Sequence, residues 1–135
     1  MLKNLSNSPL VTAMGQFKEV HPVLPAKNVS EAIVYYTEKL GFRLMFQDAE
    51  HDPKYAGVRR DGVEIHLQWH DPSEFKKVER PALRFFIDDV DGLFEEYKDK
   101  GVFHSQTALR DTPWGTREFA FYDLNGNALF FYRDL

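Results

Sequence analysis

The stretch DTPWGTREFAFYDLNGNALFFY, residues 111–132, decides the fold because it predicts two paired strands joined by a tight turn. The strands, at 116–123 and 128–134, are rich in aromatic residues, which favour the pleated surface of a sheet. The Asn125-Gly126-Asn127 triplet between them is typical of a hairpin turn. A second turn, Pro113-Trp114-Gly115, precedes the hairpin. Side-chain alternation then predicts one face of the hairpin in a core and the other in a binding pocket.

The same series of elements is predicted twice along the chain. The first half has a strand, a helix and three strands, at 21–26, about 29–40, 42–49, 54–60 and 63–69. The second half repeats this order at 81–87, 88–101, 102–109, 116–123 and 128–134. Asn28 and Glu31 have capping-box spacing, Asp88 is the expected second cap, and Gly41 and Gly101 are placed to end the helices.

We therefore expect an α+β fold made of two tandem βαβββ modules, at about 17–70 and 80–135. Packed together, the modules are expected to form a cup-shaped, mostly antiparallel sheet with the helices on the outside. With 135 residues, of which 43% are hydrophobic, residues 17–135 suit a single domain. Residues 1–16 are polar and irregular, which indicates an N-terminal arm.

Composition excludes several classes of function. The chain has no Cys, so disulfides and thiolate chemistry are excluded, and a reducing cytoplasm is the expected location. The formal net charge is -4 and no basic face is visible, which argues against nucleic acid as a partner. No segment has the length and apolar character of a signal peptide core or a membrane span, so we expect no membrane partner.

Three stretches resemble the bleomycin-resistance proteins of the glyoxalase, bleomycin-resistance and dioxygenase superfamily, also called vicinal oxygen chelate. They are PVLPAKNVSEAIVYYTEKLGF (22–42), YAGVRRDGV (55–63) and, most specifically, PWGTREFAFYDLNGN (113–127). The resemblance covers about residues 20–132. It implies a bacterial, cytoplasmic homodimer that confers antibiotic resistance by binding bleomycin in crevices between the subunits.

The resemblance also bears on metal binding, because some members of this superfamily are metalloenzymes. Those members hold a divalent ion with a His or Glu at each of four places, which correspond here to His21, His66, Ala82 and Phe130. Neither Ala82 nor Phe130 offers a donor atom, whereas catalytic metal sites use at least three protein ligands. We therefore expect no metal and no other cofactor, and a binding protein rather than an enzyme.

The candidate ligand-binding residues come from the resemblance and from strand alternation. The resemblance places Tyr55 and Trp114 at the drug-binding crevice and points His66 into the cup. Alternation adds the neighbours expected to share these faces, which are Glu64, Gln68, Arg84, Phe86, Phe130 and Tyr132. Three of these residues also have purely structural alternatives: core packing for His66, a cap over the core for Trp114, and cross-strand packing for Tyr55.

Arg84 is the most informative of these residues. A buried guanidinium requires a carboxylate, which we expect from Glu64 or from a bound ligand. A cation inside the crevice would also disfavour a cationic guest, which leaves the identity of the ligand open between a bleomycin-type antibiotic and an unknown metabolite.

Three functions follow from these observations. The leading one is metal-free, stoichiometric sequestration of a bulky aromatic drug, or a related ligand, by a homodimer. The alternative is a metal-dependent glyoxalase-like lyase or dioxygenase, with His21 and His66 as ligands and a third ligand from Glu64, Glu118 or the other subunit. A structural or regulatory dimer that binds no drug is the third.

Overall fold

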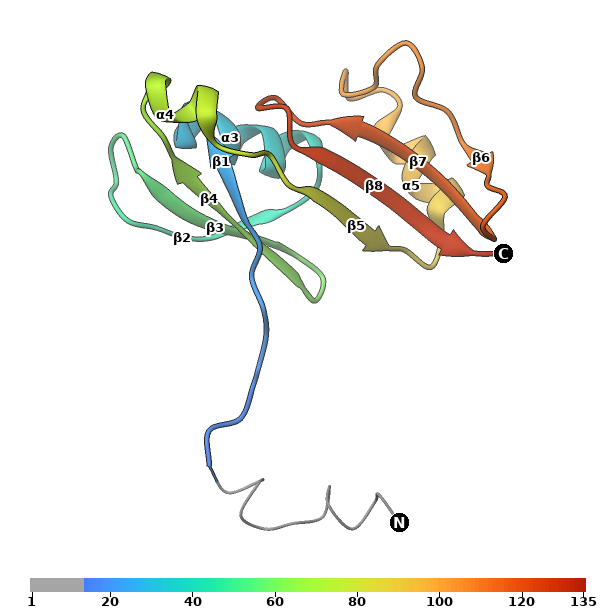
Figure 1. The fold of residues 1–135 in the computed structure, drawn as a ribbon, viewed down its shortest axis with the longest axis horizontal. Helices are drawn as coiled ribbons and strands as arrows, with labels where there is room; N and C mark the ends of the chain where they lie inside the picture. The colour runs from blue at the N-terminus through green and yellow to red at the C-terminus, as the bar shows by residue number, and fades with distance from the viewer. Residues whose placement is uncertain (1–13) are drawn as a thin grey trace.

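The computed structural model describes residues 14–135, so most of the predicted arm lies outside the described part of the chain. Two four-stranded sheets stand side by side (Figure 1). The first has the order β1-β4-β3-β2, with β1 at Val23–Ala26, β2 at Arg43–Gln47, β3 at Tyr55–Arg60 and β4 at Val63–Trp69. The second has the order β5-β8-β7-β6, with β5 at Ala82–Phe86, β6 at Arg110–Asp111, β7 at Thr116–Tyr122 and β8 at Ala128–Asp134.

The two sheets share one topology. In each, the first strand pairs in parallel with the last, and the remaining neighbours pair antiparallel. This confirms the predicted α+β fold of two tandem βαβββ modules with mostly antiparallel sheets. The hairpin that joins β7 to β8 turns at Gly126, whose φ of 84° lies in the left-handed region that favours glycine.

Each module contains one principal helix, where the sequence predicted it. The first is an α-helix, α3 (Val29–Val34), continued by one π-helical turn, η1 (Tyr35–Lys39), and the second is α5 (Val90–Tyr97). The Asn28 side chain accepts a hydrogen bond from the Glu31 amide at 2.9 Å, which satisfies one of the free N-H groups at the start of α3.

Two local predictions were wrong. The strand expected at 102–109 is absent, because this segment folds back on itself through a hydrogen bond from the Thr107 amide to the His104 carbonyl, and pairing begins only at β6. The cap of α5 is Asp89, not Asp88, and it accepts from the Gly92 amide at 3.0 Å. A short helix that was not predicted, α4 (Pro72–Lys77), lies between the two modules.

The core lies between the helices and one face of each sheet. Aliphatic and aromatic side chains from both modules make it up, and Tyr97 of α5 packs edge-on against Phe121 of β7 and Phe131 of β8. Tyr36 of η1 is fully buried in the same continuous cluster. One hydrophobic core therefore joins the two modules.

Buried hydrogen bonds also connect the modules. The Tyr36 hydroxyl donates to Asp123 Oδ2 at 2.6 Å, and Asn127 Nδ2 donates to the Pro25 carbonyl at 3.2 Å. The Tyr97 hydroxyl donates to the Leu40 carbonyl at 2.7 Å. The turn of the aromatic hairpin thus has a structural role, because it holds the second module against the first.

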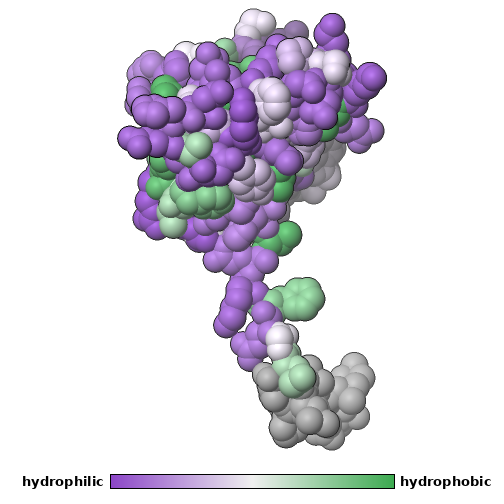
Figure 2. Space-filling model, turned by 90° about the vertical axis from the view of Figure 1, so that its left-hand side faces the viewer, coloured by the Kyte–Doolittle hydropathy of each residue, from purple (hydrophilic) through white to green (hydrophobic). Residues whose placement is uncertain are grey.

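Residues 14–20 leave the body of the protein as an extended segment (Figures 1 and 2). Hydrophobic side chains along it, such as Phe17 and Val20, are exposed. Among the described residues, no helix has both the length and the apolar character needed to cross a membrane.

Candidate functional site

The face of the first sheet opposite the core carries a group of polar side chains. Alternation places Ile65 and Leu67 in the core, so the residues between them point to the other side of β4. The predicted site residues on this face, called here the first open face, are Tyr55, Glu64, His66 and Gln68.

His66 is held by hydrogen bonds on both sides of its ring. Its Nδ1 lies 2.8 Å from the Tyr55 hydroxyl, and its Nε2 lies 2.8 Å from Glu64 Oε2. The Phe46 ring packs edge-on against the imidazole at a centroid distance of 5.2 Å. These contacts give His66 one fixed orientation on the first open face.

Glu64 is shared between His66 and a cation. Arg59 Nε donates to Glu64 Oε1 at 3.0 Å. The hydrogen bonds from His66 and Arg59 lower the pKa of Glu64 below its ordinary value, although burial acts in the opposite direction. Glu64 is therefore an ionised acceptor at neutral pH, to which His66 Nε2 donates.

His21 completes a possible set of metal ligands. Its ring centroid lies 4.6 Å from that of His66, and the ligand atoms of His21, Glu64 and His66 all lie within 4.8 Å of one another. Two imidazoles and a carboxylate are a donor set that Zn²⁺ and Fe²⁺ accept. The residues present therefore fit a divalent ion, with Glu64 as the third ligand.

The second sheet has its own open face, opposite Phe119, Phe121 and Phe131 of the core. The predicted site residues on this second open face are Arg84, Phe86, Phe130 and Tyr132. Ala82, one of the positions at which the related metalloenzymes carry a ligand, also lies on this sheet.

Arg84 pairs with a residue that the sequence did not suggest for this role. Its Nη2 donates to Glu118 Oε1 at 3.1 Å, and its guanidinium lies over the Tyr132 ring at 4.3 Å. The expectation that Glu64 or a ligand supplies the carboxylate is therefore wrong, because Glu118 of β7 supplies it within the same sheet. Glu118 is consequently not part of the group around His21.

Glu118 is almost fully buried, yet it remains a carboxylate. Burial raises its pKa, but hydrogen bonds from Arg84 and Thr116 outweigh that effect, so the pKa lies below its ordinary value. Trp114 lowers the pKa of Glu118 a little further. The Trp114 side chain, 62% exposed, therefore stands beside the second open face.

A hollow of about 360 Å³ lies at one end of the second open face, under the loop at 104–107. Phe130 and Tyr122 line it together with polar groups of His104 and Gln106. Phe130 is the only one of the nine predicted ligand-binding residues that lines it. The structure thus divides those residues between two open faces and does not bring them into one pocket.

Sequence reasoning missed two residues that shape these faces, Phe46 and Arg59, and considered Glu118 only as a metal ligand. Strand alternation could have placed Arg59 and Glu118 on these faces, because Arg59 is four residues from Tyr55, and Glu118 is two residues from Ala120, which pairs with Phe130. Phe46 had no such signal, since a bulge between Leu44 and Phe46 changes the register of β2.

A protein-family model and the sequence of a known protein both match most of this chain. The family model described as "Glyoxalase/Bleomycin resistance protein/Dioxygenase superfamily" matches residues 19–131. A bleomycin resistance protein of Geobacillus stearothermophilus is 28% identical over 129 residues, covering 84% of this chain and 95% of the relative.

Solved structures agree with this relationship. The bleomycin-binding protein of Streptomyces verticillus, solved with copper(II)-bleomycin, is 27% identical with a TM-score of 0.68, covering 87% of this chain and 97% of the other. The bleomycin resistance determinant of transposon Tn5 shares the fold, with a TM-score of 0.73 at 19% identity and coverages of 87% and 98%. The chain belongs to the glyoxalase/bleomycin resistance protein/dioxygenase superfamily.

Proposed function

We propose that the protein is a metal-free homodimer that sequesters a bulky aromatic ligand of the bleomycin type in crevices between its subunits. The observation that carries this proposal is the division of the polar and aromatic side chains between two open sheet faces. Each face holds part of a binding wall, and a second copy of the chain would bring the first open face of one subunit opposite the second open face of the other.

The exposed aromatic side chains support this proposal. Phe86 is 67% exposed and Trp114 is 62% exposed, although both are large apolar groups. Aromatic residues are enriched at subunit interfaces and in ligand pockets, because flat rings contribute much contact area at low conformational cost. A subunit interface that leaves a crevice would use these rings both for assembly and for stacking on a flat ligand.

The pairing of Arg84 also supports a cationic guest. Because Glu118 neutralises the guanidinium within the sheet, a cationic ligand would not meet an unpaired positive charge on the second open face. The chain also has a formal net charge of -4. Long-range attraction therefore favours a positively charged drug.

Tryptophan fluorescence tests this proposal directly. The chain has two Trp residues, so Trp69→Phe leaves Trp114 as the single reporter. We expect metal-free bleomycin to quench Trp114 at micromolar concentration, with one drug bound per chain in a protein that light scattering shows to be a dimer. A dimer whose Trp114 emission and melting temperature do not respond to the drug would contradict the proposal.

One observation favours a second candidate, a metal-dependent glyoxalase-like lyase or dioxygenase. His21, Glu64 and His66 would hold the divalent ion, which would supply Lewis-acid stabilisation of an oxyanion. Elemental analysis of protein purified without chelator tests it. About one Zn, Mn or Fe per chain, lost in Glu64→Gln but retained in Glu118→Gln, would support the metalloenzyme and replace the metal-free proposal.

A further inference from the structure

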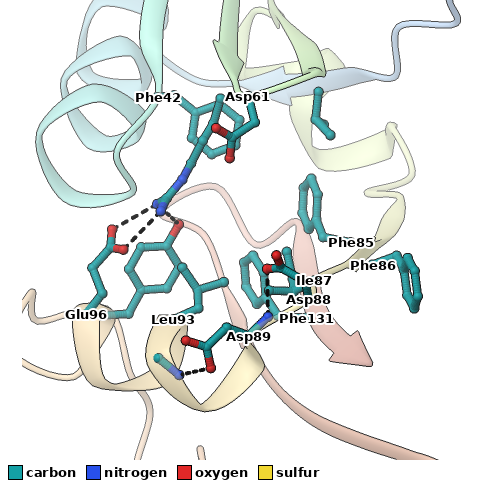
Figure 3. A pocket seen from close by; sticks show the side chains of 14 residues that line it. Phe42, Asp61, Phe85, Phe86, Ile87, Asp88, Asp89, Leu93, Glu96 and Phe131 are labelled. Atoms are coloured by element: carbon teal, nitrogen blue, oxygen red, sulfur yellow. Dashed lines mark hydrogen bonds and ion pairs between the residues drawn. The ribbon is translucent and has the colours of Figure 1, made fainter. Parts of the chain in front are cut away.

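A hollow between the two modules lies away from the group around His21. It has a volume of about 680 Å³ and opens between the β3–β4 turn of the first module and the β5–α5 connection of the second (Figure 3). None of His21, Glu64 and His66 lines it, and Phe86 is the only predicted site residue that does. Its volume is within the range of small-molecule sites.

Five of the fourteen residues that line this inter-module cavity are aromatic. Phe42 comes from the first module, whereas Phe85 and Phe131 come from the second and stack on each other at a centroid distance of 5.1 Å, with only 13° between their planes. Phe86 belongs to the rim, where its ring turns away from that of Phe85 (Figure 3). Such walls suit a flat apolar group, which can stack on rings already held in place.

The single cation among the lining residues is already occupied. Arg60 donates to both oxygens of Glu96, at 2.8 and 2.9 Å, and to the Leu40 carbonyl at 2.8 Å. It also donates to the Tyr97 hydroxyl at 3.2 Å. Since these contacts use its guanidinium, Arg60 is not available to bind an anionic ligand.

Carboxylates on the two sides of the cavity are only partly used. Asp61, in the β3–β4 turn, has no hydrogen bond or ion pair with the described residues. Asp88 Oδ1 accepts from the Asp89 amide at 2.7 Å, which leaves Oδ2 free. The lining contains four carboxylates and one guanidinium, so its formal charge is -4 + 1 = -3.

We propose that the inter-module cavity is a second ligand site, which takes a small organic cation with a flat aromatic body. The Phe85 ring, backed by Phe131, receives the apolar body, and the negative field of Asp61 and Asp88 selects the positive charge. The proposal does not rest on a subunit interface or on bleomycin binding, because both modules of one chain form the cavity.

Three matched probes test this charge selection: 2-naphthylmethylammonium, neutral 2-naphthylmethanol and anionic 2-naphthylacetate. Calorimetry should show an affinity for the ammonium about tenfold above that for the alcohol, since each of two carboxylates contributes about threefold. The acetate should bind least. The preference for the ammonium should decline as salt is raised, because partly exposed charges are screened.

Two isosteric substitutions, Asp61→Asn and Asp88→Asn, should together remove the preference for the ammonium without changing affinity for the alcohol. The Asp88→Asn side chain keeps the oxygen that accepts from the Asp89 amide, so the start of α5 should stay intact. The control is Asp99→Asn, which removes one exposed negative charge outside the cavity and should leave the preference unchanged.

Two results would overturn the proposal. One is equal affinity for all three probes, or a preference that the double variant retains. The other is loss of ammonium binding in His66→Ala, which would assign the probe to the first open face. Bleomycin binding and probe binding are separate readouts, so failure of one is distinguishable from failure of the other.

Discussion

Arg84 on β5 reaches across β8 to Glu118 on β7, and the two side chains form an ion pair of 3.1 Å above the Tyr132 ring. The pair is asymmetric, because the Arg84 side chain is 42% exposed and that of Glu118 is 3% exposed. Water can solvate Arg84 if its partner is lost, but it cannot solvate Glu118 to the same extent. The cost of breaking the pair therefore depends on which residue is changed.

We predict that Arg84→Met destabilises the protein more than Glu118→Gln does. Loss of the guanidinium leaves a buried carboxylate, which should cost about 2 kcal/mol of unfolding free energy at pH 7, against about 1 kcal/mol for Glu118→Gln. Urea unfolding measures both values. Equal costs, or the reverse order, would show that burial of Glu118 does not control the pair.

The same pair predicts a pH dependence. The pKa of Glu118 lies below its ordinary value of 4.5, so its ionisation contributes stability above that value, and this contribution is lost as pH falls through the folded-state pKa. In Arg84→Met, burial remains as the largest cause and should raise the pKa of Glu118. The difference in stability between wild type and Arg84→Met should then widen from pH 4 to pH 7, as urea unfolding at each pH would measure. The difference between wild type and Glu118→Gln should widen less, because only the lowered pKa of the wild-type carboxylate contributes to it.

Strand periodicity was sufficient to predict most of the fold, because side chains that alternate between a core and an open face leave a clear period of two. The prediction of a strand at 102–109 was wrong because VFHSQTAL has a strand-like composition. In the structure, the Thr107 hydroxyl instead accepts from the His104 amide and donates to the Ala120 carbonyl. Composition does not show which backbone groups pair. The helix α4 was missed although Asp71 and Glu74 form a capping box.

For each sheet taken separately, strand alternation predicted which candidate site residues share a face. Alternation grouped Glu64 with His66 and Arg84 with Phe86, because it determines which residues of one strand share a face. It could not identify Glu118 as the partner of Arg84, since that contact depends on the strand order β5-β8-β7. The approach of His21 to Glu64 likewise depends on the course of the chain before β1.

A buried hydrogen bond between the modules gives a third prediction. The Tyr36 hydroxyl donates to Asp123 at 2.6 Å, and both residues are buried. Tyr36→Phe removes the donor and leaves the carboxylate with fewer partners, so we expect a loss of about 2 kcal/mol of unfolding free energy. Tyr35→Phe is the matched control, because no hydrogen bond joins its hydroxyl to another described residue, and it should cost less than about 0.5 kcal/mol. Similar costs for the two variants would exclude a special role for the Asp123 contact.

Gly57 leaves room for a ring of the first open face. A methyl group at this position would clash with the Phe46 ring. Because Phe46 is 42% exposed, we expect Gly57→Ala to displace the ring outward at a cost below about 1 kcal/mol. The His66 Hε1 chemical shift should change as the edge-on contact is lost. Gly62→Ala, which meets no atom within 4 Å, should leave that signal in place.

The proposed subunit arrangement makes a further prediction about Phe130. This residue lies on the second open face, at the position where related metalloenzymes carry a Glu, while His21 and His66 lie on the first open face. If a second copy brings the two faces together, Phe130→Glu should add a carboxylate to the two imidazoles and Glu64 across the interface. Zinc affinity, measured by competition with a chelator dye, should then rise at least about tenfold, because a fourth protein ligand is gained.

Phe130→Gln is the matched control, since it has nearly the shape of the Glu variant without its charge and is a much weaker ligand for zinc. Its zinc affinity should stay close to that of the wild type. The stoichiometry adds a second criterion, because sites shared between subunits bind two ions per dimer and lose them on dissociation into monomers. If Phe130→Glu binds zinc no more tightly than Phe130→Gln while the protein is a dimer, the two open faces do not meet in the way proposed, because the new carboxylate does not reach His21 and His66.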